Sequence, residues 1–270
     1  TLSVTLAASL YNGRNPLRAF VSARRAVSLQ LAVLYPVGAL VAAGIVHFPA
    51  AVLASAGPLV LVYFWLKRSL QLSAGTLLAV QQMAEMVDRR DPYTAGHSRR
   101  VAEYCVALAV AAGCAPEEVN SIRLAALVHD LGKIRVPDEI LLKPGRLTEE
   151  ERLVMEAHPR AGYDLLAEFP EYTGLRDLVL THHERYDGLG YPNRIEGRRL
   201  PVLSQIMPVA DTIDAMTTAR PYRAALPMEA ALAELKRGAG SQWNPAIVEA
   251  ADKLFGERAE TAPARIPLPA

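Results

Sequence analysis

The last two-thirds of the chain show hydrophobic residues at helical spacing, separated by short polar segments. Val119, Ile122, Ala126 and His129 recur every three or four residues, so they form one apolar stripe on a helix that begins near Pro116. No segment shows the alternation and β-branched enrichment of a strand. The pattern therefore predicts an all-α domain. We expect its helices at residues 95–112, 116–131, 149–158, 161–168, 174–183, 203–219, 227–238 and 245–255.

Local signals mark several ends of these helices. Thr148 followed by Glu151 has the form of a capping box, which predicts the start of a helix. The segment 184–201 is rich in glycine and proline and predicts a loop, and a loop of this length in a compact domain is more often functional than a simple connection. Residues 258–270 contain three prolines and are predicted to form a flexible tail.

The N-terminal quarter has a different pattern, because residues 26–66 include no charged side chain. As a helix, this run would be roughly 60 Å long, about twice the thickness of a ~30 Å hydrocarbon core. We expect two transmembrane helices here, near 28–46 and 50–66, forming a hairpin with its turn at 47–49. The alternative is a buried helical hairpin of a soluble protein.

The flanking charges predict how this hairpin is oriented. Arginines precede it, Lys67 and Arg68 follow it, and its short turn carries no charge, which favours the cytoplasm for both ends. We interpret residues 1–25 as an N-terminal segment that could be the end of a truncated membrane region. Residues 67–90 have helical spacing and are interpreted as a connecting helix, which either pairs with its twin in a homodimer or packs on the domain. The expected location is the inner (cytoplasmic) membrane, with the helical domain in the cytoplasm.

Composition adds little to this outline. The net charge of +1 gives no indication of a nucleic-acid polymer as partner. The two cysteines, Cys105 and Cys114, show no pairing or metal-binding pattern, so we interpret them as buried reduced thiols.

The candidate chemistry lies in the histidines, five of which occur with aspartates in the helical domain. The candidate metal ligands are His97, His129, Asp130, His158, His182, His183 and Asp211. Imidazole and carboxylate together suit first-row divalent transition metals better than Mg²⁺ or Ca²⁺. Seven ligands exceed one tetrahedral ion and suit two ions, which can activate a water and hold the oxygens of a phosphoryl displacement. Asp130 is the natural bridge, and Lys133 could contact a phosphate oxygen. For an isolated His129-Asp130 pair the alternative is a buried hydrogen bond.

From about residue 91 to 257 the chain resembles the HD-GYP domain, a branch of the HD phosphohydrolases. The matching motifs are H-x-x-R-V at His97, HD-x-G-K at His129, HP-x-x-G at His158 and HHE…DG-x-GYP from His182. A run that fits VPD…KPG-x-LT begins at Val136, and a last block covers 211–223. Six elements in this order make the resemblance specific, and it covers about two-thirds of the chain. The resemblance implies an HD-type helical bundle as the fold of this domain.

The resemblance implies a metal-dependent phosphodiesterase that hydrolyses cyclic di-GMP to pGpG and/or GMP in bacterial second-messenger signalling. It implies two divalent transition-metal ions, iron or manganese, one held by His97, His129, Asp130 and Asp211 and the other by Asp130, His158, His182 and His183. The catalytic residues implied are His129, Asp130, Lys133 and Asp211. The substrate-binding residues implied are Lys133, Gly190, Tyr191, Pro192, Asp214, Arg220 and Arg223. Tyr93 stands where some members have a glutamate that supports a third ion, so we expect two.

Several roles stay open at this point. Asp214 could orient Lys133, Glu184 could orient a histidine, and Asp187 could cap its own loop. Arg100 is either a structural ion pair or a ligand contact. A second substrate hypothesis is another cyclic dinucleotide, such as cyclic GMP-AMP. A non-enzymatic hypothesis is a cyclic-dinucleotide receptor or docking module, although the usual loss of metal ligands is absent here.

Overall fold

The computed structural model describes residues 39, 42, 49–90, 96–219 and 224–259. All regular elements of these residues are helical, as predicted, and no strand occurs among them. In chain order the α-helices and 3₁₀-helices (η) are α3 Pro49–Arg90, α4 His97–Ala111, α5 Pro116–Ala126, η1 Leu131–Arg135, α6 Asp138–Leu141, α7 Glu149–Glu156, α8 His158–Leu166, η2 Pro170–Tyr172, α9 Arg176–Thr181, η3 Gly197–Arg199, α10 Val202–Thr217, α11 Met228–Gly238 and α12 Pro245–Ala259.

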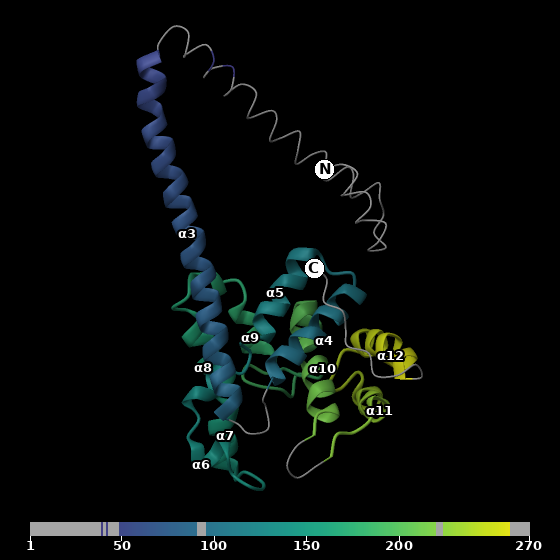
Figure 1. Cartoon of the computed structure of the whole chain (residues 1–270). Coiled ribbons are helices and arrows are strands. Elements are labelled where there is room, and N and C mark those ends of the chain that lie inside the picture. The colour runs from purple at the N-terminus through teal and green to yellow at the C-terminus, as the bar shows by residue number, and fades with distance from the viewer. Residues whose placement is uncertain (1–38, 40–41, 43–48, 91–95, 220–223, 260–270) are drawn as a thin grey trace. The chain divides into compact units, whose positions relative to one another are not determined.

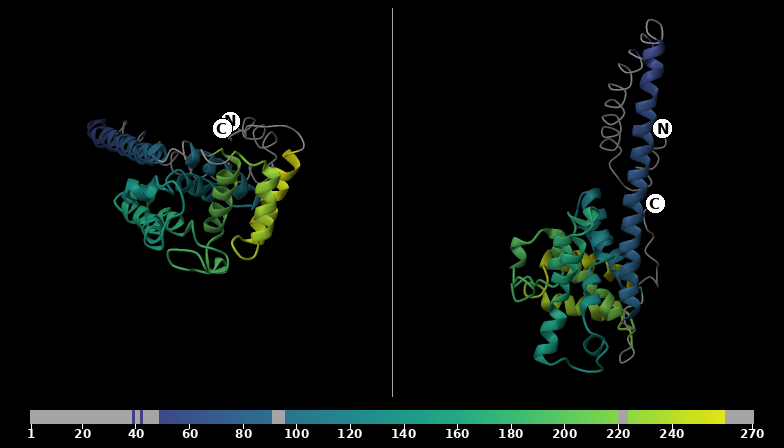
Figure 2. Two further views of the ribbon diagram at one scale, coloured as in Figure 1. Left: turned by 90° about the horizontal axis from the view of Figure 1, so that it is seen from below. Right: turned by 90° about the vertical axis from the view of Figure 1, so that its left-hand side faces the viewer.

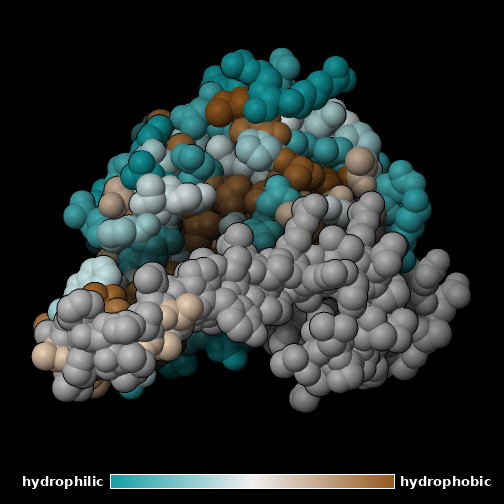
Figure 3. Space-filling view, turned by 90° about the horizontal axis from the view of Figure 1, so that it is seen from above, coloured by the Kyte–Doolittle hydropathy of each residue, from teal (hydrophilic) through white to brown (hydrophobic). Residues whose placement is uncertain are grey.

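The chain divides into two compact units, residues 1–71 and 72–270. In the second unit, α4, α5, α9 and α10 lie together at the centre, with α11 and α12 on one side and α6, α7 and α8 on the other (Figures 1 and 2). The core between them is continuous from Val80 to Phe255, and Ile206, Met207 and Ile213 of α10 are fully buried in it. Among the residues coloured in Figure 3, hydrophobic side chains gather toward the middle and hydrophilic ones surround them.

Helix α3 packs its last four turns against this core. Val80, Ala84 and Val87 are buried at helical spacing, and the Tyr172 hydroxyl donates to the carbonyl oxygen of Leu77 at 3.4 Å. The connecting helix expected at 67–90 is therefore confirmed as helix, and one of its faces packs on the domain.

The two expected membrane spans are not confirmed by the structure. Almost all of the first, 28–46, lies outside the described residues. The second, 50–66, forms the beginning of α3, which continues without interruption into the polar sequence that ends at Arg90. Within the described part of the chain, no helix combines the length and the apolar character needed to cross a membrane. The prediction of a second span therefore finds no support.

Most helix boundaries lie within a few residues of their predicted positions, with two differences that matter for the site. Helix α5 ends at Ala126 and not at residue 131, because hydrogen bonds of the i→i+3 type tighten the following turn. In this turn, Val128 N donates to Ala125 O at 3.1 Å and Leu131 N donates to Val128 O at 3.0 Å. Helix α8 begins at His158 and not at residue 161. The predicted capping box at Thr148 is confirmed, and the loop 184–201 contains only the short η3.

Candidate metal centre

The seven predicted ligands come together in two adjoining groups. Asp130, His158, His182 and His183 form one group, and His97, His129 and Asp211 form the other. Within each group, the candidate ligand atoms all lie within 4.8 Å of one another. All seven side chains are buried or half-buried.

Most of these ligands come from the ends of helices. His97 and His158 are the first residues of α4 and α8, His182 and His183 follow α9, His129 and Asp130 occupy the turn between α5 and η1, and Asp211 lies within α10. A side chain at a helix end can point along the helix axis into a shared space, whereas one in the middle can only point sideways. This placement explains how five separate segments reach one small volume.

The close approach of η1 to α8 depends on Gly132. A Cβ atom at this position would overlap the carbonyl oxygen of His158 and would lie 2.5 Å from the backbone nitrogen of Gly162. Only glycine allows the two backbones to come this close. The glycine of the HD-x-G-K motif therefore brings Asp130 next to His158.

Three imidazoles are oriented alike, by a hydrogen bond from Nδ1 to the carbonyl oxygen three residues earlier: His129 to Ala126 at 2.8 Å, His158 to Met155 at 2.7 Å and His182 to Val179 at 2.6 Å. Because a carbonyl oxygen only accepts, Nδ1 of each ring carries a proton, which leaves Nε2 as the atom that can bind a metal through its lone pair. The Nε2 atoms of His158 and His182 face each other at 3.2 Å. Two lone pairs at this distance repel, and a bound cation between them removes the repulsion. This donor set fits a divalent transition metal.

Asp130 lies between the two groups. Its Oδ1 is 3.3 Å from His158 Nε2 and 3.9 Å from His182 Nε2, whereas its Oδ2 is 3.5 Å from His129 Nε2 and 3.9 Å from His97 Nε2. One carboxylate oxygen thus faces each group, which is the geometry that a bridging ligand requires.

Lys133 donates to Asp130 Oδ2 at 2.6 Å. Burial opposes the ionisation of Asp130, but the charges of Lys133 and the nearby histidines outweigh it and hold its pKa well below the ordinary value. Asp130 is thus a direct partner of the lysine, and an orienting role of Asp214 toward Lys133 stays a prediction.

Asp214 orients His97. Its Oδ2 is 2.7 Å from His97 Nδ1, and Arg100 pairs with the same carboxylate, with Nε 2.5 Å from Oδ1. The Asp214 side chain is only 2% exposed. Its carboxylate is therefore engaged by His97 and Arg100, and Arg100 is confirmed as a structural ion pair. The substrate-binding role expected for Asp214 stays a prediction.

His97 contacts carboxylates through both ring nitrogens, since Nε2 lies 3.2 Å from Asp211 Oδ1. Burial lowers the pKa of His97, but the hydrogen bonds to Asp211 and Asp214 outweigh this and raise it to about 10. The same bond to His97 keeps the pKa of buried Asp211 below its ordinary value. In the metal-free protein His97 is therefore an imidazolium.

In the group of Asp130, His158, His182 and His183, two histidines have lowered pKa values, whereas the pKa of His97 is raised. Burial, together with the neighbouring His158, lowers the pKa of His183 to about 3, and burial also holds the pKa of His182 well below its ordinary value. Both imidazoles are neutral at physiological pH and are ready to bind a metal.

The GYP segment folds back on the second group. A Cβ on Gly190 would lie 2.5 Å from the His183 carbonyl oxygen, so glycine is required there. The Tyr191 ring stacks on the His183 ring with centroids 4.8 Å apart. Pro192 follows Tyr191 and is half-buried. Tyr191 and Gly190 therefore lie beside the candidate metal ligand His183, and their expected role in binding a substrate stays a prediction.

Two acidic residues hold this loop. Glu184 accepts from the backbone nitrogens of Asn193 at 2.7 Å and Ile195 at 3.0 Å, so it fixes the loop and does not orient a histidine. Asp187 accepts from the backbone nitrogen of Leu189 at 3.0 Å, which confirms its capping role. Three further predicted positions, Arg220, Arg223 and Tyr93, lie outside the described residues.

Residues 81–247 match the family model described as "HD domain". The chain belongs to the HD domain family. The match covers the last turns of α3 and all of the candidate ligands.

Curated relatives of this HD domain chain carry related names. "Cyclic di-GMP phosphodiesterase response regulator RpfG" of Xanthomonas campestris is 42% identical over 175 residues, which cover 63% of this chain and 46% of that protein. "Cyclic di-GMP phosphodiesterase" of Thermotoga maritima is 39% identical, covering 67% and 50%. "3'3'-cGAMP-specific phosphodiesterase 3" of Vibrio cholerae is 36% identical, covering 65% and 38%. The chain therefore spans about half the length of these relatives, or less.

Solved structures agree with the fold. An HDG"Y"P protein from Bdellovibrio bacteriovorus superposes with a TM-score of 0.51 at 19% identity, over 60% of this chain and 54% of that one. This likeness supports an all-helical HD-type fold.

The motifs did not point to two arginines beside the centre. Arg135 and Arg160 line a cavity of about 480 Å³ that also reaches His158 and Gly132. Arg160 donates to Asn193 in the GYP loop at 3.3 Å. Their positions two residues after Lys133 and His158 were the only signal that the sequence offered.

Proposed function

We propose that this chain is a metal-dependent phosphodiesterase of the HD-GYP type, which hydrolyses cyclic di-GMP to pGpG and/or GMP with two divalent ions, iron or manganese. The observation that carries the proposal is the position of Asp130, whose two oxygens face two separate groups of buried ligands. The names of the curated relatives support the substrate class.

Two divalent ions bound here would supply Lewis-acid chemistry, activating a water and stabilising the charge that develops on a phosphodiester. The chain's own residues would hold and orient the reactants. Asp130 fixes the spacing of the two groups, and Lys133, which is 19% exposed, can offer its ammonium to a phosphate oxygen. The half-buried Tyr191 presents an aromatic ring beside the centre for a base or ribose. Arg220 and Arg223 are proposed to hold the phosphates through bidentate contacts.

A second substrate, cyclic GMP-AMP, is kept because relatives of similar identity are named for it. The full chain, loaded with Mn²⁺ or Fe²⁺, should be assayed against both cyclic dinucleotides, with product analysis. Faster hydrolysis of cyclic GMP-AMP would favour the second substrate. Binding without hydrolysis, at full metal content, would favour the receptor hypothesis instead.

The matched variant for this test is Asp130→Asn, which keeps the shape of the side chain but removes its charge. We expect it to lose both ions or most of its activity, by roughly 10²-fold or more in turnover. Asp177→Asn on the exposed side of α9 is the control and should behave as the unmodified chain. Full metal content and unchanged turnover in Asp130→Asn would contradict the bridging role.

We further propose that the connecting helix supports a homodimer. Leu72, Leu78, Met83 and Met86 of α3 are each at least 48% exposed, although Val80 and Ala84 of the same helix are buried. A second copy of the same helix could cover this apolar surface. Sedimentation of the full chain and of Met86→Glu would test the proposal, since the charge should produce a monomer.

Membrane attachment is a separate proposal that rests on residues 26–66. Their lack of charge supports it, as does the exposure of residues 59–66, each at least half exposed. The proposed location is the bacterial cytoplasmic membrane, with the HD domain in the cytoplasm.

A further inference from the structure

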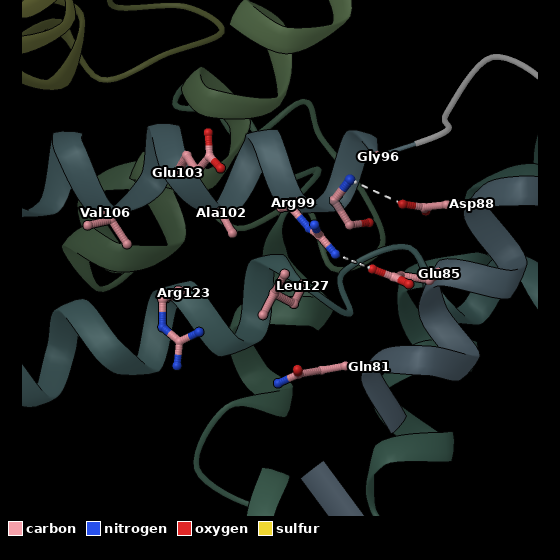
Figure 4. A pocket seen from close by; sticks show the side chains of 11 residues that line it. Gln81, Glu85, Asp88, Gly96, Arg99, Ala102, Glu103, Val106, Arg123 and Leu127 are labelled. Carbon is pink, nitrogen blue, oxygen red and sulfur yellow. Dashed lines mark hydrogen bonds and ion pairs between the residues drawn. The ribbon is translucent and has the colours of Figure 1, made fainter. Parts of the chain in front are cut away.

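The last turns of α3 reach two of the segments that carry candidate ligands. Figure 4 shows Glu85 and Asp88 pointing from α3 toward the beginning of α4. A cavity of about 330 Å³, with Gln81, Ala102 and Leu127 in its lining, lies beside these contacts. Polar contacts therefore contribute to the spacing of α3 and α4 at this point, where apolar packing is incomplete.

Asp88 replaces a missing helix cap. The N-cap residue of α4 is Gly96, in the left-handed conformation at φ 71°, and no side chain of its own caps the helix. Asp88 Oδ2 instead accepts from the backbone nitrogen of Ser98 at 3.1 Å, and Asp88 is only 4% exposed. A carboxylate at a helix N-terminus satisfies a free N–H group and interacts favourably with the helix dipole. Asp88 thus fixes the first turn of α4, which begins with His97.

Arg90 caps the other kind of helix end, because it binds the carbonyl groups at the end of η1. Its Nη2 donates to the Val136 carbonyl oxygen at 2.6 Å, and its Nη1 lies 3.4 Å from the carbonyl oxygens of both Lys133 and Ile134. Its Nε also pairs with Asp138 at 2.6 Å. These carbonyls lie at the end of η1, whose beginning directly follows the proposed bridging ligand Asp130.

We propose that Asp88 and Arg90 are positioning residues of the metal centre, which couple the placement of α3 to His97 through α4 and to Asp130 and Lys133 through η1. The proposal rests on the proposed function for its two ions, but its prediction concerns metal affinity and does not require turnover. Because His97 belongs to one ligand group whereas Asp130 faces both, the two residues should have different effects. Asp88 should influence one ion, and Arg90 should influence both.

The test is a Mn²⁺ titration of the full chain, followed by electron paramagnetic resonance, which distinguishes a single ion from a coupled pair. Asp88→Ala should weaken one ion about 10- to 100-fold and leave the other unchanged, whereas Arg90→Ala should weaken both by a similar factor. Asp88→Asn should restore most of the affinity because its amide oxygen can accept the same bond. Arg90→Lys should stay impaired because a lysine cannot reproduce the forked contacts.

Two exposed neighbours provide controls. Glu85→Ala removes the exposed ion pair with Arg99 one turn earlier on α3, and Asp138→Ala removes only the ion-pair partner of Arg90. Both should bind metal as the unmodified chain does. Amide exchange in the metal-free protein should become faster at Ser98 in Asp88→Ala but not in Glu85→Ala.

Unchanged affinity for both ions in Asp88→Ala would overturn the proposal. The proposal would also be overturned if Asp88→Ala lost affinity for both ions equally and Asp88→Asn did not restore it. That pattern would indicate a general loosening of the fold. If the unmodified chain binds two ions but hydrolyses no cyclic dinucleotide, the proposed function fails, and the metal titrations still decide the roles of Asp88 and Arg90.

Discussion

His97 differs from the other candidate ligands in its charge. Both of its ring nitrogens face carboxylates, Asp214 at 2.7 Å and Asp211 at 3.2 Å, and because carboxylates only accept, the metal-free ring keeps both protons. His158 and His182 face each other through Nε2 and have only one partner each on the Nδ1 side, a backbone carbonyl. The two halves of the centre should therefore respond differently to pH.

We predict that an ion in the His97 group binds with the release of about one proton, because the pKa of His97 is raised to about 10. The direction in which metal affinity changes with pH follows from this raised pKa. Below pH 10 the proton competes with the metal, so the affinity should rise with pH, by about tenfold per pH unit. In the other group the pKa of His183 is lowered to about 3, mainly by burial, so His183 itself should release no proton on metal binding above pH 5.

Metal titrations between pH 6 and 8, repeated in buffers of different ionisation enthalpy, measure this proton release. Asp214→Asn removes one of the two carboxylates that hold the proton on His97, so it should reduce the pH dependence of the first group. A flat affinity for both ions over this range would contradict the assignment of His97.

At the scale of helices, the centre depends on short elements more than on long ones. The turn after α5, the single turn of η1 and the first turn of α8 bring Asp130 and His158 together. Their contact is between backbones, at Gly132 and Gly162, so it leaves no room for a side chain.

Gly132→Ala should therefore destabilise the domain and weaken the metal centre. The added methyl group must push η1 away from α8, and overpacking of this kind costs about 1–3 kcal/mol of the free energy of unfolding. Urea unfolding and metal titration would measure the two effects. Gly174→Ala is the matched control, because a Cβ there meets no atom within 4 Å. Equal stability of the two variants would show that η1 can shift at little cost.

At the scale of the whole molecule, the hydrophobic core of the second unit is formed by residues between Val80 and Phe255. Among the described residues, the buried members of this core begin at Val80, in the last turns of α3.

We predict that a chain beginning at Ser69 stays in the aqueous phase, whereas the full chain partitions with detergent or lipid. The physical reason is that residues 26–66 lack charge, and 59–66 expose large apolar side chains. Detergent phase separation of both chains, followed by immunodetection, would measure it. Recovery of the full chain in the aqueous phase after mild extraction would rule out the two-span interpretation.

The sequence by itself determined the all-α class, most helix positions and the set of candidate ligands that the fold brings together. Hydrophobic spacing and capping are local, so a stripe such as Val119, Ile122 and Ala126, or the box at Thr148, can be recognised without the fold. The ligands were recognisable because their motifs carry unusual residue types at fixed spacing. Helix ends were less certain, since the turn at His129 tightens through tertiary packing.

Only the tertiary structure decided which side chains support the ligands. Asp214 and His97 are 117 positions apart, and Arg90 meets the carbonyl of Val136 across 46 positions. Asp88 meets the backbone nitrogen of Ser98 at the start of α4, and no sequence motif indicated this contact. Such contacts depend on how helices pack against one another, and packing is set by the sum of many weak contacts that no short stretch of sequence contains.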